Sequence, residues 1–278
     1  MRHLKRQKGF PATGSLRGFG ATALALSMLA GASTDAQARP DIAAVKQFAR
    51  RGYVTDDQYG IATSFATVPI GGSSVDLALM VPARPGLAPL VVYLPATGET
   101  RSAGQALRSA WAKSGYAVLS LQPLPVEALG KVLAAVTERA HLHEAPFDRI
   151  DLARVGLAGL ELGADAALAA TGALPLPVAA VISLNEAVGT AGAADTAVGL
   201  PLLSVSADAA TRIRRVAAGG DRYLLTLADT GASPTAAAIE VATVQAVTTA
   251  FLDAHVKRDS AAREWLAKDA PRWLGVRV

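Results

Sequence analysis

The chain has 278 residues, of which 51% are hydrophobic, 27 are Lys or Arg and 23 are Asp or Glu. This length is enough for one large α/β domain with a full core. The absence of cysteine excludes a disulfide framework and a lipid-attachment cysteine, and an aromatic content of 5% leaves few platforms on which bases or sugars stack.

The N-terminal segment has the three parts of a secretory signal peptide. Its basic residues are Arg2, Lys5, Arg6, Lys8 and Arg17. Apolar and small residues then run without interruption from Phe19 to Ala32, and Ala36 and Ala38 form an A-x-A cleavage site. The apolar stretch is too short to span a bilayer comfortably. We therefore expect residues 1–38 to be removed on export, which leaves residues 39–278 in the periplasm or the medium.

The positive net charge of the chain belongs to this leading segment. Residues 1–38 hold five of the 27 basic residues and one of the 23 acidic residues, so the remaining chain carries 22 of each. A neutral domain has no electrostatic reason to seek phosphate backbones. We expect no nucleic-acid partner, and no membrane anchor once the signal is cleaved.

Hydrophobic patterns then predict the elements in chain order. A helix is predicted near Asp41–Arg51, and alternating stretches over Gly60–Thr67 and Ser74–Val81, separated by Gly71 and Gly72, predict a β-hairpin. Short apolar runs predict buried strands over residues 90–94, 117–121, 154–158, 178–184, 202–206 and 223–227. Helical patterns cover residues 102–114, 126–142, 161–171, 209–217, 235–255 and 260–268. No segment after the signal offers the roughly 20 apolar residues of a membrane-spanning helix.

This alternation of strands and helices predicts the fold class. Crossover helices pack on a parallel sheet, and ligands bind at the carboxyl ends of its strands. We expect a doubly wound, mostly parallel α/β sheet with an N-terminal β-hairpin, in a single domain over residues 39–278. Candidate functional residues should follow the strands.

A strand, a glycine-flanked turn and an Ala-rich helix follow one another over residues 154–169. Gly159 and Gly163 flank Glu161, a pattern that resembles the nucleophile elbow G-x-S-x-G of the α/β-hydrolase superfamily, with glutamate in place of serine. The resemblance extends over most of residues 58–268. The closing segment FLDAHVKRDSAAREWLAK is similar to that of dienelactone-hydrolase and platelet-activating-factor-acetylhydrolase-like members.

The resemblance implies a set of site residues. Glu161 stands at the nucleophile position and Asp208 at the position of the acid. Ala96 and Thr97 stand in the oxyanion loop, where relatives have a His-Gly-rich sequence. The remaining candidate ligand-binding residues are Leu160, Leu162, Glu186 and Asp229.

The catalytic histidine implied by the family is absent from its expected loop, which reads ADTGA over residues 228–232. His3 leaves with the signal, His255 falls within a helix, and His141 and His143 precede the strand that leads to Glu161. A Glu161 nucleophile would form an ester that needs a base for its hydrolysis. We expect the site to have lost hydrolytic chemistry.

Five of the six predicted core strands are followed by an acidic residue at the same edge of the sheet. These residues are Glu99, Glu161, Glu186, Asp208 and Asp229, while Gln122 follows the sixth strand. Crowded carboxylates raise one another's pKa or recruit a cation. The favoured explanation is that they are polar loop residues and helix caps, and the helix dipole alone favours Glu161 at a helix N-terminus.

The sequence therefore predicts an exported protein with a degenerate α/β-hydrolase site that binds a small molecule or acts as a scaffold, with no cofactor and no metal. One alternative is a secreted carboxylic-ester hydrolase that uses an unrecognised serine or Glu161. Another is a divalent-cation-dependent enzyme or binder that uses the carboxylates at the strand ends.

The signal-peptide hypothesis predicts the N-terminus of the exported protein. Cleavage after Ala38 leaves Arg39 as the first residue, which intact-mass measurement of the exported protein will show. A mass that retains the stretch Phe19–Ala32 would mean that this stretch is an anchor.

Overall fold

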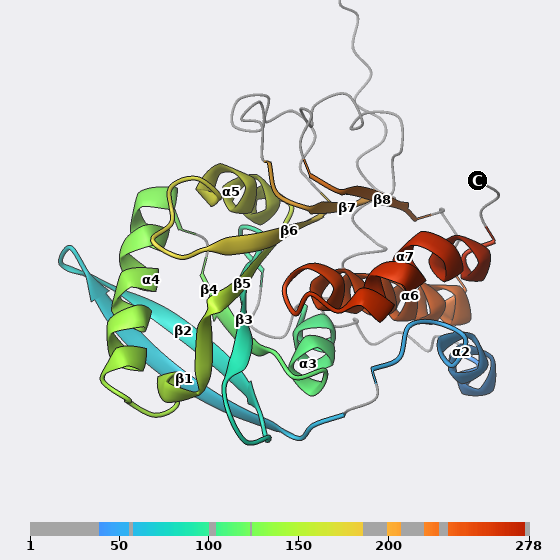
Figure 1. Cartoon of the computed structure of the whole chain (residues 1–278), viewed down its shortest axis with the longest axis horizontal. Helices are drawn as coiled ribbons and strands as arrows, with labels where there is room; N and C mark the ends of the chain where they lie inside the picture. The colour runs from blue at the N-terminus through green and yellow to red at the C-terminus, as the bar shows by residue number, and fades with distance from the viewer. Residues whose placement is uncertain are drawn as a thin grey trace, which may run out of the picture.

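The computed structural model describes residues 39–55, 58–99, 104–122, 124–185, 199–206, 220–227 and 233–275. These residues form an α/β fold, in which an eight-stranded mixed sheet carries helices on both faces (Figure 1). The predicted α/β class is confirmed. The predicted signal peptide and the predicted helix over residues 209–217 lie outside the described residues.

The strands are ordered β1-β2-β4-β3-β5-β6-β7-β8 across the sheet. Their bounds are Ile61–Ile70 for β1, Ser73–Pro82 for β2, Ala88–Leu94 for β3, Ala117–Leu121 for β4, Ile150–Leu160 for β5, Val178–Leu184 for β6, Leu202–Ser206 for β7 and Arg222–Thr226 for β8. β2 pairs antiparallel with β1 and with β4, and all other pairs are parallel. Within the described sheet, only β2 therefore runs against the others.

The outer edge of the sheet is formed by β1, which pairs with β2 along its whole length, from Ile61 opposite Pro82 to Ile70 opposite Ser73. Gly71 and Gly72 connect the two strands with φ values of 55° and 87°. Residues with a side chain rarely adopt these angles, so the glycine pair allows the tight turn.

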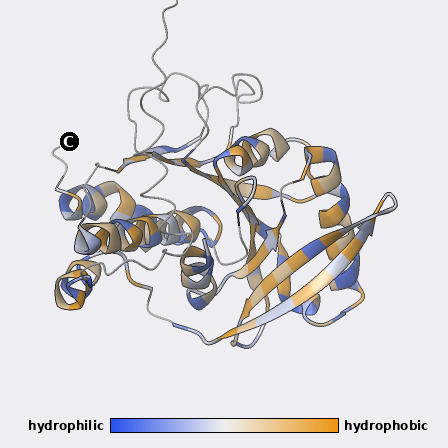
Figure 2. Cartoon of the chain, turned by 180° about the vertical axis from the view of Figure 1, so that it is seen from behind, coloured by the Kyte–Doolittle hydropathy of each residue, from blue (hydrophilic) through white to orange (hydrophobic). Residues whose placement is uncertain are grey.

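Helices cover both faces of the sheet. α4 (Val126–His141) and α5 (Leu162–Ala170) lie on one face, and α3 (Gln105–Lys113), α6 (Pro234–His255) and α7 (Ser260–Trp273) lie on the other. α2 (Ile42–Ala49) packs against α6, and a short 3-10 helix, η2 (Phe147–Arg149), leads into β5. Each face has its own hydrophobic cluster, and hydrophobic residues line the central strands between them (Figure 2).

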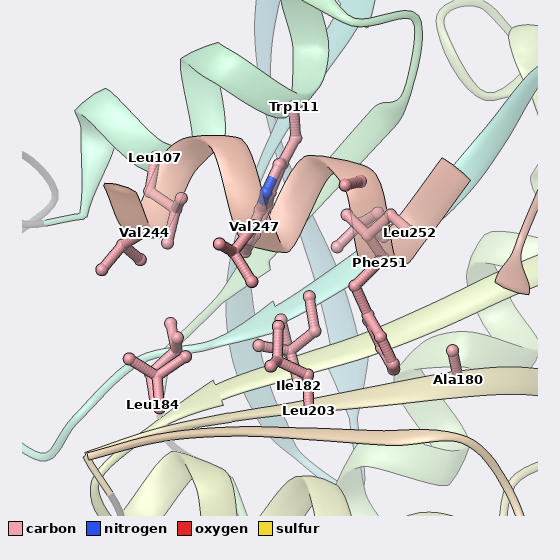
Figure 3. Packing of buried hydrophobic residues seen from close by; sticks show 14 of the residues in the cluster. Leu107, Trp111, Ala180, Ile182, Leu184, Leu203, Val244, Val247, Phe251 and Leu252 are labelled. Atoms are coloured by element: carbon pink, nitrogen blue, oxygen red, sulfur yellow. The ribbon is translucent and has the colours of Figure 1, made fainter. Parts of the chain in front are cut away.

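α6 is long and apolar enough to cross a membrane by length and composition. The expectation that no segment after the signal has these properties is therefore wrong. The second half of α6 is buried in the core, however, where Val244, Val247 and Phe251 face the side chains of β6 and β7 (Figure 3). This is the packing of a core helix.

β5 and α7 extend furthest beyond the ranges that their sequence patterns predict. β5 starts at Ile150 rather than Arg154, because its first residues pair with the start of β3 across a register shift. α7 continues to Trp273 rather than ending at Lys268. There the Trp273 ring packs 4.7 Å from the ring of Phe48, and this contact holds the last turn of α7.

A buried carboxylate joins α6 to the amino end of β4. Asp253 accepts hydrogen bonds from the hydroxyls of Tyr116 (2.6 Å) and Tyr53 (2.8 Å), and its Oδ1 lies 2.7 Å from Lys257 Nζ. Burial, followed by the charge of Asp253, raises the pKa of Tyr116. The Asp253 carboxylate therefore accepts hydrogen bonds from two tyrosine hydroxyls and also pairs with an ammonium group.

We expect Asp253→Asn to lower the free energy of unfolding by about 3 kcal/mol, because the amide leaves a partly buried ammonium group uncompensated. Urea unfolding of the full chain measures this. The matched control is Glu264→Gln, which removes a carboxylate paired with Lys268 on the exposed side of α7 and should change stability little. Equal losses in the two variants would contradict the assigned role of Asp253.

Candidate functional site

Glu161 forms the whole turn between a strand and a helix. β5 ends at Leu160 and α5 begins at Leu162, and Glu161 between them has φ 53° and ψ −116°. This conformation is costly for a residue with a side chain, and such residues cluster at functional sites. The backbone thus has the geometry that the glycine spacing around Glu161 predicts.

The two glycines are required because backbones approach closely at this turn. A Cβ on Gly159 would lie 2.1 Å from the carbonyl oxygen of Gly163, and a Cβ on Gly163 would lie 2.2 Å from that of Leu94. No side chain fits at such distances. The first turn of α5 is therefore seated directly on the ends of β5 and β3.

The backbone of Glu161 is tied on both sides. Its N–H donates to the carbonyl of Leu184 at 2.8 Å, and its carbonyl accepts from the N–H of Ala164 at 2.9 Å. Its half-buried side chain makes no capping hydrogen bond to α5. A helix cap therefore does not explain why a carboxylate stands here.

A second carboxylate, Glu99, is enclosed in the loop after β3. It accepts hydrogen bonds from the Ala96 N–H at 2.8 Å and from the Tyr93 hydroxyl at 3.0 Å. The Arg108 guanidinium of α3 lies 3.7 Å from it and 5.0 Å above the Tyr93 ring. The side chains of Glu99 and Arg108 are only 4% and 6% exposed.

The position of Glu99 raises the pKa of its carboxyl group. Burial is the main cause, and the negative charge of Glu161 adds to it. The Ala96 N–H, the Tyr93 hydroxyl and Arg108 act in the opposite direction. β3 and β5 pair in parallel with Leu94 opposite Gly159, so the loop that holds Glu99 and the turn at Glu161 follow the same edge of the sheet.

Two hollows flank the end of β3, and Pro95 borders both. The larger, of about 410 Å³, lies beside α3, and Glu99, Arg108 and Tyr93 contribute to its wall. The smaller, of about 250 Å³, lies at the start of α5. The larger falls within the size range of small-molecule sites, and the smaller lies somewhat below it.

The four described residues predicted to bind a ligand take different positions. Thr97 and Leu162 border the smaller hollow, and Leu162 is 44% exposed. Ala96 is buried and offers its N–H to Glu99. Leu160 is buried in the hydrophobic cluster that faces α6.

The other predicted site residues, Asp208, Glu186 and Asp229, lie outside the described residues. Of the predicted ring of carboxylates, the structure thus describes Glu99 and Glu161. Among the described residues, no group of three or more His, Asp or Glu side chains is placed to hold a metal ion.

The histidines of the described ranges lie away from Glu161. His141 and His143 precede β5, so the whole eleven-residue strand separates them from the turn at its far end. His255 contacts the ring of Tyr223 near the amino end of β8, at the opposite edge of the parallel strands. No described histidine can therefore take a proton at Glu161.

The sequence did not single out Tyr93 and Arg108. Tyr93 belongs to a wholly apolar strand, where it reads as core, and Arg108 reads as a solvated residue of an amphipathic helix. One signal was present, because Arg108 directly follows Leu107 and lies three residues before Trp111 on the side of α3 that proves to be buried.

No protein-family model matches this chain, and no curated protein sequence matches it.

His255 makes stability depend on pH. Burial is the main cause that lowers its pKa below the ordinary 6.5, with a smaller effect of Arg263, while Asp221 opposes them. As pH falls below about 6.5, the unfolded chain takes up a proton that the folded chain resists, so stability falls with pH. We expect His255→Gln to lose this component between pH 7.5 and 5.5 in urea unfolding, while the exposed control His141→Gln keeps it. Equal behaviour of the two variants would show that His255 is not its source.

Proposed function

We propose that this chain is an exported member of the α/β-hydrolase superfamily that binds a small molecule and does not hydrolyse it. The observation that carries the proposal is the turn at Glu161, where a strained backbone holds a carboxylate at the place of the nucleophile.

The topology supports membership in that superfamily. The order β1-β2-β4-β3-β5-β6-β7-β8, with β2 reversed, is the strand order of α/β-hydrolases. The close approach of Gly159 and Gly163 supports it further, because a nucleophile elbow needs a sharp turn between strand and helix.

Three departures from the family argue against hydrolysis. A glutamate replaces the nucleophilic serine, and the loop over residues 228–232 contains no histidine. In addition, the Ala96 N–H, which stands in the loop that supplies an oxyanion donor in the family, is already bonded to Glu99. Nucleophile, base and one donor for the oxyanion are thus all altered.

The two hollows support retention of a ligand. The smaller lies at the carboxyl ends of β3 and β4, where α/β proteins bind small molecules, and the larger reaches the ends of the same two strands from across β1 and β2. The signal-like segment over residues 1–38 supports a role in the periplasm or the medium.

We expect the purified chain to hydrolyse p-nitrophenyl acetate no faster than an unrelated protein of equal concentration. Glu161→Ser should remain inactive, because a serine hydroxyl is nucleophilic only when an adjacent base takes its proton. Adding Ala232→His to Glu161→Ser places an imidazole in the loop where the resemblance implies the catalytic histidine, and should yield weak acyl transfer.

The controls separate this proposal from the alternative of an active esterase. Wild-type turnover that persists in Glu161→Ala but disappears when one serine is replaced would overturn the assignment of the site. A serine-directed fluorophosphonate probe should label the Glu161→Ser, Ala232→His double variant and leave the wild type unlabelled.

A further inference from the structure

The floor of the larger hollow is a row of four side chains that crosses four strands. Phe65 of β1 pairs with Ala78 of β2, Ala78 pairs with Ser120 of β4, and Ser120 pairs with Tyr93 of β3. Directly paired residues point to the same face of a sheet, and here that face is the one covered by α3. All four border the hollow.

This row explains why the hollow exists. Ala78 and Ser120 are small and lie between two aromatic rings, so the surface dips by the volume that larger side chains would fill. Met80, two residues beyond Ala78 on β2, extends the apolar wall. Phe65, at the outer end of the row, is 67% exposed. The result is an open, largely apolar slot of about 410 Å³ between two aromatic residues.

The inner end of the slot is formed by a cluster of polar side chains with little exposure. Tyr93, Glu99 and Arg108 border it together; Tyr93 and Arg108 are buried, and the side chain of Glu99 is 4% exposed. Gly104 makes room for them, since a Cβ at this position would lie 2.7 Å from the Tyr93 hydroxyl and 3.0 Å from Glu99 Oε1. The cluster places a carboxylate of low exposure at the end of an apolar slot.

The described charges around the slot favour a cation. Glu99 and Asp76 border it, against the single guanidinium of Arg108. The charge of Glu161 also acts on Glu99. The Arg108 guanidinium carbon lies 5.0 Å from the centre of the Tyr93 ring, so a cation–π contact forms part of the wall of the slot.

We propose that this slot binds an organic cation, with an apolar body about the size of one ring lying over Ala78 and Ser120 and a primary ammonium or amidinium group held by Glu99. The proposal rests on the proposed function, for which it names the class of ligand. Phe65 and Tyr93 flank the apolar body, and the cation replaces part of the hydration that burial denies to the carboxylate.

Three probes of equal size and different charge test the assignment on the full exported chain. They are benzylamine, benzyl alcohol and benzoate, and titration calorimetry at pH 7.5 measures their affinities. We expect benzylamine to bind at least tenfold more tightly than benzyl alcohol, and benzoate to bind least. A preference for benzoate, tightest binding of benzyl alcohol, or no binding of any probe would overturn the proposal.

Two variants locate the binding. Ala78→Leu fills the slot from the face of β2 without touching the polar cluster and should abolish benzylamine binding. Glu99→Gln should reduce the ratio of the benzylamine and benzyl alcohol affinities to near one. The matched control Glu264→Gln, a carboxylate removal on α7, should leave both affinities unchanged. Benzylamine binding that survives Ala78→Leu in a folded variant would place the site elsewhere and refute the inference.

The outcomes remain distinguishable from those of the proposed function. Failure of all three probes to bind, with no ester turnover, would remove the cation slot and leave the loss of hydrolysis standing. Binding of benzylamine together with serine-dependent ester turnover would do the reverse.

Discussion

The contact between the first turn of α5 and the end of β3 is the constraint on which the site depends. With only 2.2 Å between a Cβ at position 163 and the carbonyl oxygen of Leu94, glycine is the one residue that lets the helix approach. This approach sets the sharp reversal at Glu161 and its unusual backbone angles. It also fixes the loop that begins at Pro95, and with it the position of Glu99. The positions of both carboxylates in the described site therefore depend on the same close contact between α5 and β3.

The loop after β3 holds a carboxylate whose burial disfavours its charged form. Burial disfavours the charged form of Glu99, and the structure offsets this with an N–H, a hydroxyl and a guanidinium. The same N–H is thereby withdrawn from any ligand oxyanion. In this loop the N–H stabilises an internal anion, the Glu99 carboxylate, instead of an anion on a ligand. The hydrogen bond that helps to hold this loop is thus the same one that occupies the Ala96 N–H.

Much of this architecture could be predicted from local sequence, and the reasons are physical. β4, β6 and β7 begin and end where their apolar runs do, since strands buried on both faces have little polar interruption. The sequence pattern does not predict the start of β5, because charged residues interrupt the apolar residues over 150–154. These residues form a strand through pairing with β3. The turn at Glu161 was predictable because its glycine spacing is local.

The slot beside α3 could not be predicted in the same way. Its floor requires that Phe65, Ala78, Ser120 and Tyr93 come into register, and these residues are brought together by strand order and not by spacing in the chain. Arg108 offers a related lesson, since a charged residue on a short helix is ordinarily solvated. Its burial follows from a partner, Glu99, that lies on a preceding loop. The slot is therefore determined by strand pairing and by side-chain contacts that local sequence patterns do not reveal.

In the slot, the shape and the charge of a ligand are selected by different parts of the chain. Ala78 and Ser120 set the depth of the slot from strands whose backbones are held by the sheet, whereas Glu99 sets its charge from a loop. Substitutions at the two strand positions can therefore narrow or widen the range of ligand shapes while the preferred charge stays constant. Relatives of this chain could diverge in specificity by exchanging one methyl or hydroxyl group for a larger side chain, with the turn at Glu161 unaltered.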